Sequence, residues 1–464
     1  MLNIKSVKKV YLVGIGGVGM TPLALYLKEA GFDVTGSDIR DFRLRRFLTE
    51  KGIKVTIGHS SENVPLNSVL IYSNALNSDN IELLTAKEHN IPILSRIEAL
   101  KVISQDKRLI AVTGSYGKST VTSFISAVLG ATNFNPSWII GADLFNFNPA
   151  RKGYSDLFVL ECDESKQEFL DFKPFFVVLT NIGSDHLSNY GGSRENLYLS
   201  IFSFLKKVSK KGKIFLNADD PASERISVEL DIRARIIKCG KKDNSHYIYR
   251  LGSSFFDGKK IVTSFSIEEK GETSFSSQID MAGERNVLDA CFAYAVLVEL
   301  GLSKEVARDA LRNLPILDRR FEIKQVNKRS IIIDDEGDSP DVIENVLKDA
   351  RYYFPLKRIL SIVQPHRYSR LKSLFSEYVR VLSNYSDDII LTPIYEASED
   401  RIEGFNSFSL GDFIKEKSFG GEVRIVSSLS EAVDIGKIYL AKDYVIITLG
   451  PGDIWRVADE LTEK

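Results

Sequence analysis

The segment from residue 109 to residue 125 constrains the fold most strongly, because it joins an apolar strand to a helix through a glycine-rich loop. Leu109–Val112 is an apolar run, Thr-Gly-Ser-Tyr-Gly-Lys-Ser-Thr follows at 113–120, and the residues up to 125 are compatible with a helix. Glycines allow backbone amides to turn toward a polyphosphate, Lys118 supplies a positive charge, and the Ser119 hydroxyl is suited to bind Mg²⁺. The segment predicts an α/β domain that binds a nucleoside triphosphate.

This loop is a shortened variant of the widespread phosphate-binding loop. The usual pattern has a glycine five positions before its Gly-Lys pair, whereas this chain has Val112 there and turns at Thr113-Gly114. A glycine-rich turn with an incidental lysine is the alternative, and the strand and helix on either side argue against it. The loop residues expected to contact the nucleotide are Gly114, Ser115, Tyr116, Gly117, Lys118, Ser119 and Thr120.

Length and charge narrow the class of protein. A chain of 464 residues exceeds one hydrophobic core and suggests about three domains. Its 61 basic and 62 acidic side chains nearly cancel, so charge gives no argument for binding nucleic acid or an anionic membrane. The cysteines at 162, 239 and 291 are widely spaced and odd in number, which predicts neither a disulfide framework nor a zinc site.

The N-terminal segment and the hydropathy pattern bear on location. Residues 1–9 lack the apolar core and cleavage site of a signal peptide, and no apolar run reaches transmembrane length. We therefore expect a cytoplasmic protein without membrane insertion. The sequence does not fix the oligomeric state, for which we expect a monomer or a weak homodimer.

Alternating strand and helix patterns predict an α/β protein with three domains. We expect a Rossmann-like domain at 1–107, a central ATPase-like domain with the phosphate loop at 108–318, and a second Rossmann-like domain at 319–464. The pattern between 246 and 282 predicts an antiparallel insertion. The expected strands are 10–13, 33–38, 69–72, 109–112, 157–160, 176–180, 213–216, 330–334, 358–363, 388–391 and 444–449, and the expected N-terminal helices are 20–30 and 42–51.

A second glycine-rich loop follows the first strand. Gly14-x-Gly16-Gly17-x-Gly19 is similar to the dinucleotide fingerprint, and Asp38 ends a later strand where a ribose-binding carboxylate would lie. A helix N-terminus binds any diphosphate, so these glycines suit the pyrophosphate of a UDP-sugar as well as that of NAD. We favour the UDP-sugar because a triphosphate loop, rather than a hydride-transfer site, follows. A nicotinamide-dependent oxidoreductase remains the alternative from another class.

Two further strands end in residues suited to bind metal. Glu161 directly follows the apolar run 157–160, at the sheet edge that faces the phosphate loop, and predicts a Mg²⁺ ligand. Asp163 and Glu164 are as compatible with a solvated acidic loop as with a site. His186 follows the strand at 176–180, where it would contact a second metal ion or the transferring phosphate.

These motifs, in this order, resemble the successive blocks of the Mur ligase family of peptidoglycan synthesis, and the resemblance covers nearly the whole chain. The matching blocks are residues 14–20, 113–119, 161–165, 181–186, 283–290, 319–321, 364–370 and 450–454. Residues 58–60 and 73–75 resemble UDP-contacting segments of the branch that adds L-alanine. The resemblance implies ATP and Mg²⁺ as cofactors and ATP-dependent ligation of an amino acid, L-alanine above all, to UDP-N-acetylmuramate through an acyl phosphate.

The resemblance also implies roles for individual residues. It implies a contact to adenine from Asn286, to phosphates from Arg320, and a place at the interdomain cleft for Asp335 and Arg367. The implied catalytic residues are Lys118, Glu161, His186, Arg320, Asp335 and Arg367, and the implied metal ligands are Ser119, Glu161 and His186. The implied UDP contacts are Gly14, Gly16, Gly17, Val18, Gly19, Ser37, Asp38, His59, Ser73, Asn74 and Ala75.

The chain departs from the family pattern at two places that bear on its substrate. Ser115-Tyr116 replaces the usual Thr-His, and Asp338 or Ser339 stands where alanine-adding members carry histidine. An acidic Asp338 would favour an amino acid that is larger or bears an amine. The alternatives are therefore a ligase that recycles a murein tripeptide, a paralogue with altered amino-acid choice, and a nucleotide-binding protein without catalysis.

Overall fold

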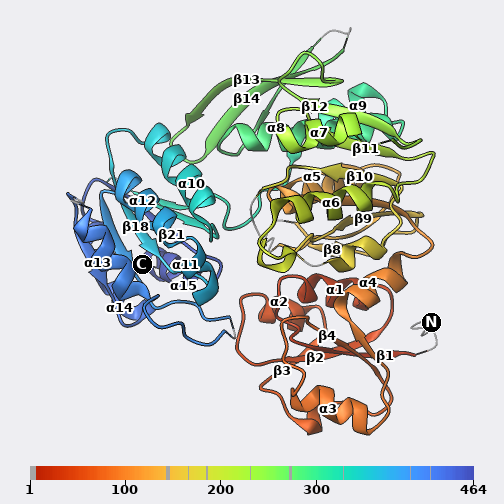
Figure 1. The fold of residues 1–464 in the computed structure, drawn as a ribbon, viewed down its shortest axis with the longest axis horizontal. Helices are drawn as coiled ribbons and strands as arrows, with labels where there is room; N and C mark the ends of the chain where they lie inside the picture. The colour runs from red at the N-terminus through yellow and green to blue at the C-terminus, as the bar shows by residue number, and fades with distance from the viewer. Residues whose placement is uncertain are drawn as a thin grey trace. The chain divides into compact units, whose positions relative to one another are not determined.

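The computed structural model of the chain describes residues 7–142, 147–165, 167–183, 187–229, 231–270, 274–327, 329–397, 399–417 and 420–463. Its internal contacts divide the chain into two units. The first unit comprises Met1–Ser253, Ser264–Ile279 and Glu284–Ile316, and the second comprises Ser254–Thr263, Asp280–Gly283 and Leu317–Lys464. The strands of the described residues form three sheets (Figure 1).

The first sheet has the strand order β3-β2-β1-β4-β5, and all its strands are parallel. Its strands are β1 (Lys9–Val13), β2 (Asp33–Asp38), β3 (Lys54–Ile57), β4 (Val69–Tyr72) and β5 (Ile93–Ser95). The helices between them are α1 (Met20–Glu29), α2 (Arg45–Glu50), α3 (Ile81–Glu88) and α4 (Arg96–Ser104). The strand order reverses beside β1, which is where open α/β sheets bind ligands at their carboxyl edge.

The second sheet runs in the order β15-β14-β13-β12-β11-β10-β6-β9-β7-β8. The strand β6 (Arg108–Thr113) lies between β10 (Phe176–Leu179) and β9 (Leu157–Glu161), with both pairs parallel. The helix α5 (Lys118–Gly130) starts after the phosphate loop and packs against α8 (Glu284–Glu299). The other strands are β7 (Ser137–Ile139), β8 (Ala150–Arg151), β11 (Lys213–Asn217), β12 (Arg235–Gly240), β13 (Tyr247–Phe256), β14 (Ile261–Glu269) and β15 (Phe275–Ile279), and the other helices are α6 (Arg194–Leu205), α7 (Pro221–Glu229) and α9 (Lys304–Ala310).

The third sheet belongs to the second unit and has the order β16-β17-β21-β18-β19-β20. Only β16 (Glu322–Val326) pairs antiparallel among these strands, with β17 (Ile331–Asp335). The remaining strands are β18 (Arg358–Val363), β19 (Asp388–Leu391), β20 (Val423–Ile425) and β21 (Tyr444–Leu449). The helices are α10 (Pro340–Tyr353), α11 (Tyr368–Ser373), α12 (Phe375–Tyr385), α13 (Ser407–Glu416), α14 (Leu429–Tyr439) and α15 (Trp455–Thr462).

The structure confirms the predicted α/β class, and each predicted strand appears within a residue or so of its expected bounds. The predicted antiparallel insertion is also present, because residues 257–260 join β13 to the neighbouring β14 as a hairpin. Short strands such as β3 and β20 were not predicted from the sequence. Both are only partly buried, so they lack the apolar run that reveals a central strand.

No helix in the described ranges is long and apolar enough to span a lipid bilayer.

One hydrophobic core extends over the first sheet and the second. It includes Leu12 of β1, Leu23 of α1, and Phe158 of β9, all without exposed surface. The ring of Phe158 stacks on that of Tyr26 in α1, with centroids 5.5 Å apart. This shared core explains why the first sheet and most of the second belong to the first unit, from which only the hairpin residues 254–263 of the second sheet are excluded.

We expect Phe158→Ala to lower the free energy of unfolding by about 3–5 kcal/mol, since it leaves a cavity in this core and removes the stack on Tyr26. Thermal and denaturant unfolding followed by circular dichroism would measure the change. Tyr154→Ala is the matched control, because Tyr154 is 90% exposed and its loss should alter stability by about 0.5 kcal/mol at most. Equal stability of the two variants would contradict the shared core.

Candidate nucleotide-binding site

The phosphate loop joins β6 to α5 through two glycines in left-handed backbone conformations. Gly114 has a φ of +126°, and a Cβ built on it would lie 2.4 Å from Oγ1 of Thr180. Gly117, with a φ of +84°, is the residue before the first turn of α5. Any side chain at Gly114 would clash with the neighbouring strand end, so the turn requires glycine there.

Residues 180–183, which follow β10, form hydrogen bonds with the phosphate loop. The Tyr116 backbone amide donates to Oδ1 of Asn181 at 3.1 Å, and Nδ2 of Asn181 donates back to the Tyr116 carbonyl at 2.9 Å. Oγ1 of Thr180 donates to the same carbonyl at 2.5 Å, and the Gly183 amide donates to Oγ of Ser115 at 2.7 Å. Thr180 and Asn181 were not among the predicted site residues. The signal for them was their position directly after a buried strand.

Lys118 lies in a nearly closed, acidic environment. Its Nζ donates to the Gly114 carbonyl at 2.7 Å and pairs with Oε2 of Glu164 at 3.0 Å. Burial lowers the pKa of the Lys118 ammonium, but Glu164, Asp163 and Glu161 outweigh burial and place that pKa above its usual value. Glu164 is fully buried, so the alternative of a solvated acidic loop is wrong for this residue.

Glu161 ends β9 beside the phosphate loop. Its Oε2 accepts the Gly141 amide at 3.0 Å, and Ser119 donates a hydrogen bond to its carboxylate. Burial raises the pKa of Glu161, while Lys118 and the Ser119 hydrogen bond oppose this rise. A carboxylate and a hydroxyl beside a phosphate loop are the hard oxygen donors that Mg²⁺ prefers, so these two residues fit that ion.

Of the two remaining predicted residues of this site, the structure describes only one. Thr120 lies in the first turn of α5 and is nearly buried. His186 lies outside the described residues. Within the described ranges, no group of three or more acidic, histidine or cysteine side chains forms a metal cluster. The described donors are therefore Ser119 and Glu161, which would need phosphate or water to complete the shell.

A cavity of about 440 Å³ adjoins the loop within the first unit. Its lining combines Tyr116 with Asn181 and Gly183 on one side and with the first turns of α8 on another. The guanidinium carbon of Arg285 lies 5.1 Å from the centroid of the Tyr116 ring. Asn286, the predicted adenine contact, lies in the same turn of α8, although the described lining includes its neighbours Glu284 and Arg285 instead.

Asp289 of α8 lies against the phosphate loop. A Cβ built on Gly117 would approach its Oδ1 to 3.1 Å, and its side chain is 2% exposed. Its Oδ2 is buried and makes no hydrogen bond among the described residues. Burial raises the pKa of Asp289 to about 8, against the opposing charge of Arg285. This carboxyl is therefore mostly protonated at neutral pH, which reduces its repulsion of a bound polyphosphate.

The second predicted site lies at the carboxyl edge of the first sheet. The amides of Gly14 and Ile15 donate to the Ser37 carbonyl at 2.9 and 3.0 Å, which fixes the start of the glycine loop. The Gly16 amide donates to Oδ2 of Asp38 at 2.9 Å. Asp38 therefore stabilises the glycine loop through this hydrogen bond. Gly17 donates back to Gly14, and Val18 and Gly19 complete the turn into α1.

The loops after β3 and β4 reach the same edge. The Ser73 amide donates to the Val13 carbonyl at 3.1 Å, and the Ala75 amide donates to Oγ of Ser73 at 3.3 Å, with Asn74 between them. His59 lies 3.1 Å from Oγ of Ser37 through its Nδ1. The structure thus brings the predicted residues of four loops to one edge, together with a buried carboxylate, Glu82, that the sequence did not reveal.

The second unit positions Arg320 and Asp335. Oδ2 of Asp335 accepts the Phe321 amide and Oδ1 accepts the Gly337 amide, both at 2.7 Å. Burial raises the pKa of Asp335 to about 6, although Arg320 and these two amides oppose the rise. The Arg320 guanidinium pairs with Glu336 at the surface. Arg320 is thus exposed while its acidic neighbour Asp335 is buried.

The carboxyl ends of β17, β21 and β18 lie in register, with Asp335 opposite Leu449 and Leu449 opposite Val363. Arg367 follows β18 and has an exposed side chain and a φ of +64°, and its amide donates to the Tyr395 carbonyl. A positive φ is unfavourable for an arginine and is common at functional sites.

Asp338 lies close to two basic side chains of the second unit. Its carboxylate pairs with Arg370 and lies 3.7 Å from Nδ1 of His366. The Tyr378 hydroxyl donates a hydrogen bond to the backbone carbonyl of Asp338. The charge of Asp338 is therefore balanced by Arg370 within the protein, which weakens the expectation that this carboxylate favours an amine-bearing amino acid.

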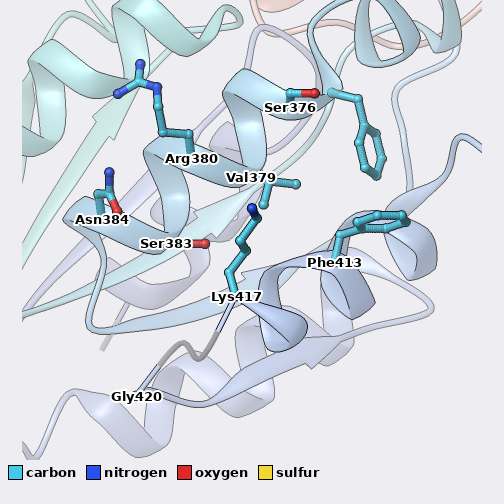
Figure 2. Close-up of a pocket in the computed structure, with 9 residues that line it drawn as sticks. Ser376, Val379, Arg380, Ser383, Asn384, Phe413, Lys417 and Gly420 are labelled. Atoms are coloured by element: carbon cyan, nitrogen blue, oxygen red, sulfur yellow. The ribbon is translucent and has the colours of Figure 1, made fainter.

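The second unit also carries a groove of about 770 Å³ between α12 and α13. Figure 2 shows Arg380 and Asn384 projecting from α12, with Phe413 and Lys417 nearby. Arg380 pairs with Glu344 at 2.6 Å. None of the residues predicted from the sequence lines this groove, so it is separate from the predicted site of this unit.

Comparisons with known proteins match most of the chain. Residues 9–108 match the domain described as Mur ligase family, catalytic domain, and residues 112–297 match the Mur ligase middle domain. Residues 319–452 match the domain described as Mur ligase, glutamate ligase domain. The three matches follow the three sheets in order, which supports the three-domain architecture.

Similar proteins extend over the whole length. The chain is 35% identical over 462 residues to UDP-N-acetylmuramate--L-alanine ligase of Sulfurihydrogenibium sp. (strain YO3AOP1), covering 99% of this chain and 98% of that protein. It is 34% identical to the protein of the same name from Aquifex aeolicus (strain VF5), covering 99% and 98%.

Solved structures agree with these relatives. The crystal structure of UDP-N-acetylmuramate-alanine ligase from Thermotoga maritima matches with a TM-score of 0.80 and 26% identity, covering 98% of both chains. A murein peptide ligase from Psychrobacter arcticus shares the fold, with a TM-score of 0.73 at 19% identity and 98% coverage of both chains. With full-length relatives above 30% identity and three matching domains in order, this chain belongs to the Mur ligase family.

Proposed function

We propose that this protein ligates L-alanine to the carboxylate of UDP-N-acetylmuramate at the expense of ATP, in peptidoglycan precursor synthesis. Full-length similarity to ligases of that name supports the proposal. The observation that carries the chemistry is the partly buried group of Lys118, Ser119 and Glu161 at the phosphate loop, with the buried Glu164 paired to Lys118. A cytoplasmic location is part of the proposal, because UDP-sugar and ATP are both found there.

Each domain has a proposed role. Residues 1–107 would bind the UDP-sugar through the glycine loop and the side chains of Ser37, Asp38, His59 and Ser73. Residues 108–318 would bind ATP, and residues 319–464 would bind the amino acid. Asn286 is proposed to contact adenine. Arg320, Asp335 and Arg367 are proposed to serve the phosphates and the incoming amino acid, and His186 a second metal ion.

The reaction follows from the chemistry of a carboxylate. A carboxylate is a poor electrophile, so its oxygen attacks the γ-phosphorus of ATP first, which releases ADP and forms an acyl phosphate. The amine of the amino acid then attacks the acyl carbon, and the tetrahedral intermediate expels inorganic phosphate. Both steps develop negative charge on phosphoryl or acyl oxygens, which preorganised cations stabilise.

The phosphate loop supplies that stabilisation in the proposed mechanism. Lys118 would bind the outer phosphates in place of the Gly114 carbonyl, while Glu164 keeps its ammonium charged and oriented. Ser119 and Glu161 would hold Mg²⁺, which neutralises phosphate charge when bound. The two hydrogen bonds between the Asn181 side chain and the Tyr116 backbone would keep the loop amides directed toward the phosphates.

We expect phosphate release to require ATP, Mg²⁺, UDP-N-acetylmuramate and L-alanine together, with the amide product identified by mass. The test should compare all twenty amino acids and the murein tripeptide in parallel. Since Arg370 pairs with the Asp338 carboxylate, this carboxylate should not select an amine-bearing side chain. Preference for a diamino acid or the tripeptide would refute the choice of L-alanine, and hydride transfer to NAD without ATP would refute the ligase.

Lys118→Ala should lower kcat by about 10²-fold or more, because it removes a preorganised charge at the transferring phosphate. Initial rates of phosphate release at saturating substrates would measure this loss. Lys210→Ala is the matched control, since Lys210 is an exposed lysine of the same unit. Near-normal turnover of Lys118→Ala would remove Lys118 from the mechanism.

The KM for ATP should rise by roughly threefold to tenfold between pH 7 and pH 9, because Asp289 ionises near pH 8 beside the phosphate loop. Asp289→Asn should flatten this rise. A carboxyl whose pKa is raised in the folded state stabilises the fold most at low pH and loses that stabilisation as pH rises toward 8. The wild-type Tm should therefore fall more steeply than that of Asp289→Asn between pH 5 and pH 8. Identical pH profiles of the two proteins would contradict this role.

A further inference from the structure

A buried carboxylate lies beneath the carboxyl edge of the first sheet. Glu82 is in the first turn of α3 and has no exposed surface. Ionised carboxylates are rarely buried without several hydrogen-bond donors, because the cost of removing the charge from water is large. The N-terminus of α3 favours a negative charge at this position.

Three groups donate to one oxygen of this carboxylate. Oε1 accepts the Tyr11 hydroxyl at 2.9 Å, Nδ2 of Asn63 at 2.8 Å and the Ser60 amide at 3.3 Å. Burial raises the pKa of Tyr11 above its usual value, so this hydroxyl keeps its proton and acts as a donor. Oε1 is therefore fully used by the protein, and it ties β1 to the loop after β3.

The other oxygen connects to two of the proposed UDP contacts. Oε2 accepts the Ser37 hydroxyl at 2.5 Å and lies 2.9 Å from Nδ1 of His59. Nδ1 of His59 also lies 3.1 Å from Oγ of Ser37. Because the single hydroxyl proton of Ser37 is directed to Glu82, both atoms that face Nδ1 are acceptors.

This geometry fixes the proton of the neutral His59 ring. Two acceptors around Nδ1 require that Nδ1 carries the hydrogen, which leaves Nε2 with a lone pair. Nε2 makes no hydrogen bond within the described part of the chain, and the His59 side chain is about 10% exposed. His59 therefore presents a hydrogen-bond acceptor at an edge where the glycine loop, Ser37 and Ser73 also lie.

We propose that Glu82 is a positioning residue that holds His59 in its Nδ1–H form, so that Nε2 accepts a hydrogen bond from the uridine of the substrate. This inference rests on the proposed function. Uridine offers two kinds of donor, the uracil N3–H and the ribose hydroxyls. Cytosine has an acceptor at N3, so a contact to the base would also select uridine over cytidine.

The experiment compares Glu82→Gln with the wild-type protein in two measurements. The first is the ¹⁵N chemical shifts of His59 in the ligand-free protein at pH 8, which report the tautomer directly. The second is the affinity for UDP and for ATP by calorimetry. The glutamine side chain would place an NH₂ donor where the carboxylate of Glu82 accepts hydrogen bonds from five groups. One of these groups is Nδ1 of His59, so the substitution should disturb the Nδ1–H form. Glu88→Gln, at the exposed end of the same helix, is the matched control.

We expect Glu82→Gln to weaken UDP binding by about tenfold or more while ATP affinity stays unchanged, since loss of one well-formed hydrogen bond commonly has this size. The wild-type spectrum should show the Nδ1–H form, and the variant should lose it. Equal loss of UDP and ATP affinity with a lower Tm would mean a purely structural role. A doubly protonated or Nε2–H ring in the wild-type protein would overturn the proposal.

Nucleotide analogues identify the donor and separate this inference from the proposed function. A wild-type preference for UDP over 2′-deoxy-UDP that is lost in Glu82→Gln would assign a ribose hydroxyl, whereas a lost preference for UDP over CDP would assign the uracil N3–H. If the wild-type protein binds UDP but Glu82→Gln binds it equally well, only the role of Glu82 fails. If the wild-type protein binds no UDP, the proposed function fails and the contact to uridine fails with it.

Discussion

The ion pair between Lys118 and Glu164 is the interaction on which the nucleotide site depends. Both side chains are withdrawn from water, and removing one partner of such a pair typically costs about 3–5 kcal/mol because it leaves a buried charge. The pair holds the lysine beside the Gly114 carbonyl, within the turn that only glycine can make. Because Asp163 and Glu161 add to the negative potential, the ammonium stays charged despite its burial. The loop is therefore set for a polyphosphate before one binds.

The two sites of the first unit use the same physical arrangement in different ways. In each, parallel strands end at one edge and a glycine turn leads into a helix N-terminus, which favours phosphate. Around the phosphate loop, charges of both signs lie close together at the partly buried Lys118 and Glu161 and at the buried Glu164. At the edge of the first sheet, one buried carboxylate, Glu82, gathers five donors instead. In the proposed function, the first arrangement would serve phosphoryl transfer and the second would serve recognition of an uncharged nucleoside.

Much of the fold could be predicted because its central strands are fully buried. Strands such as β10 and β21 appear as continuous apolar runs, while β3 and β20 lie at sheet edges and carry no such pattern. The phosphate loop could also be predicted from a local pattern, because glycines and a lysine at this spacing after a strand are typical of phosphate binding. Asn181 and Thr180 were overlooked because polar residues after a strand are common, and only their hydrogen bonds to Tyr116 distinguish them.

The sequence by itself determined the order of the domains, the two glycine loops and the acidic and basic residues at the ends of strands. These features are local, because each depends on neighbouring residues and on the period of the strand or helix. Only the tertiary structure decided which charges meet. Glu164 pairs with Lys118 across 46 positions, and Glu82 meets His59 and Tyr11 across 23 and 71. Such partners are chosen by how sheets and helices pack, and burial then decides whether a carboxylate is solvated, ion-paired or, as at Asp289, protonated.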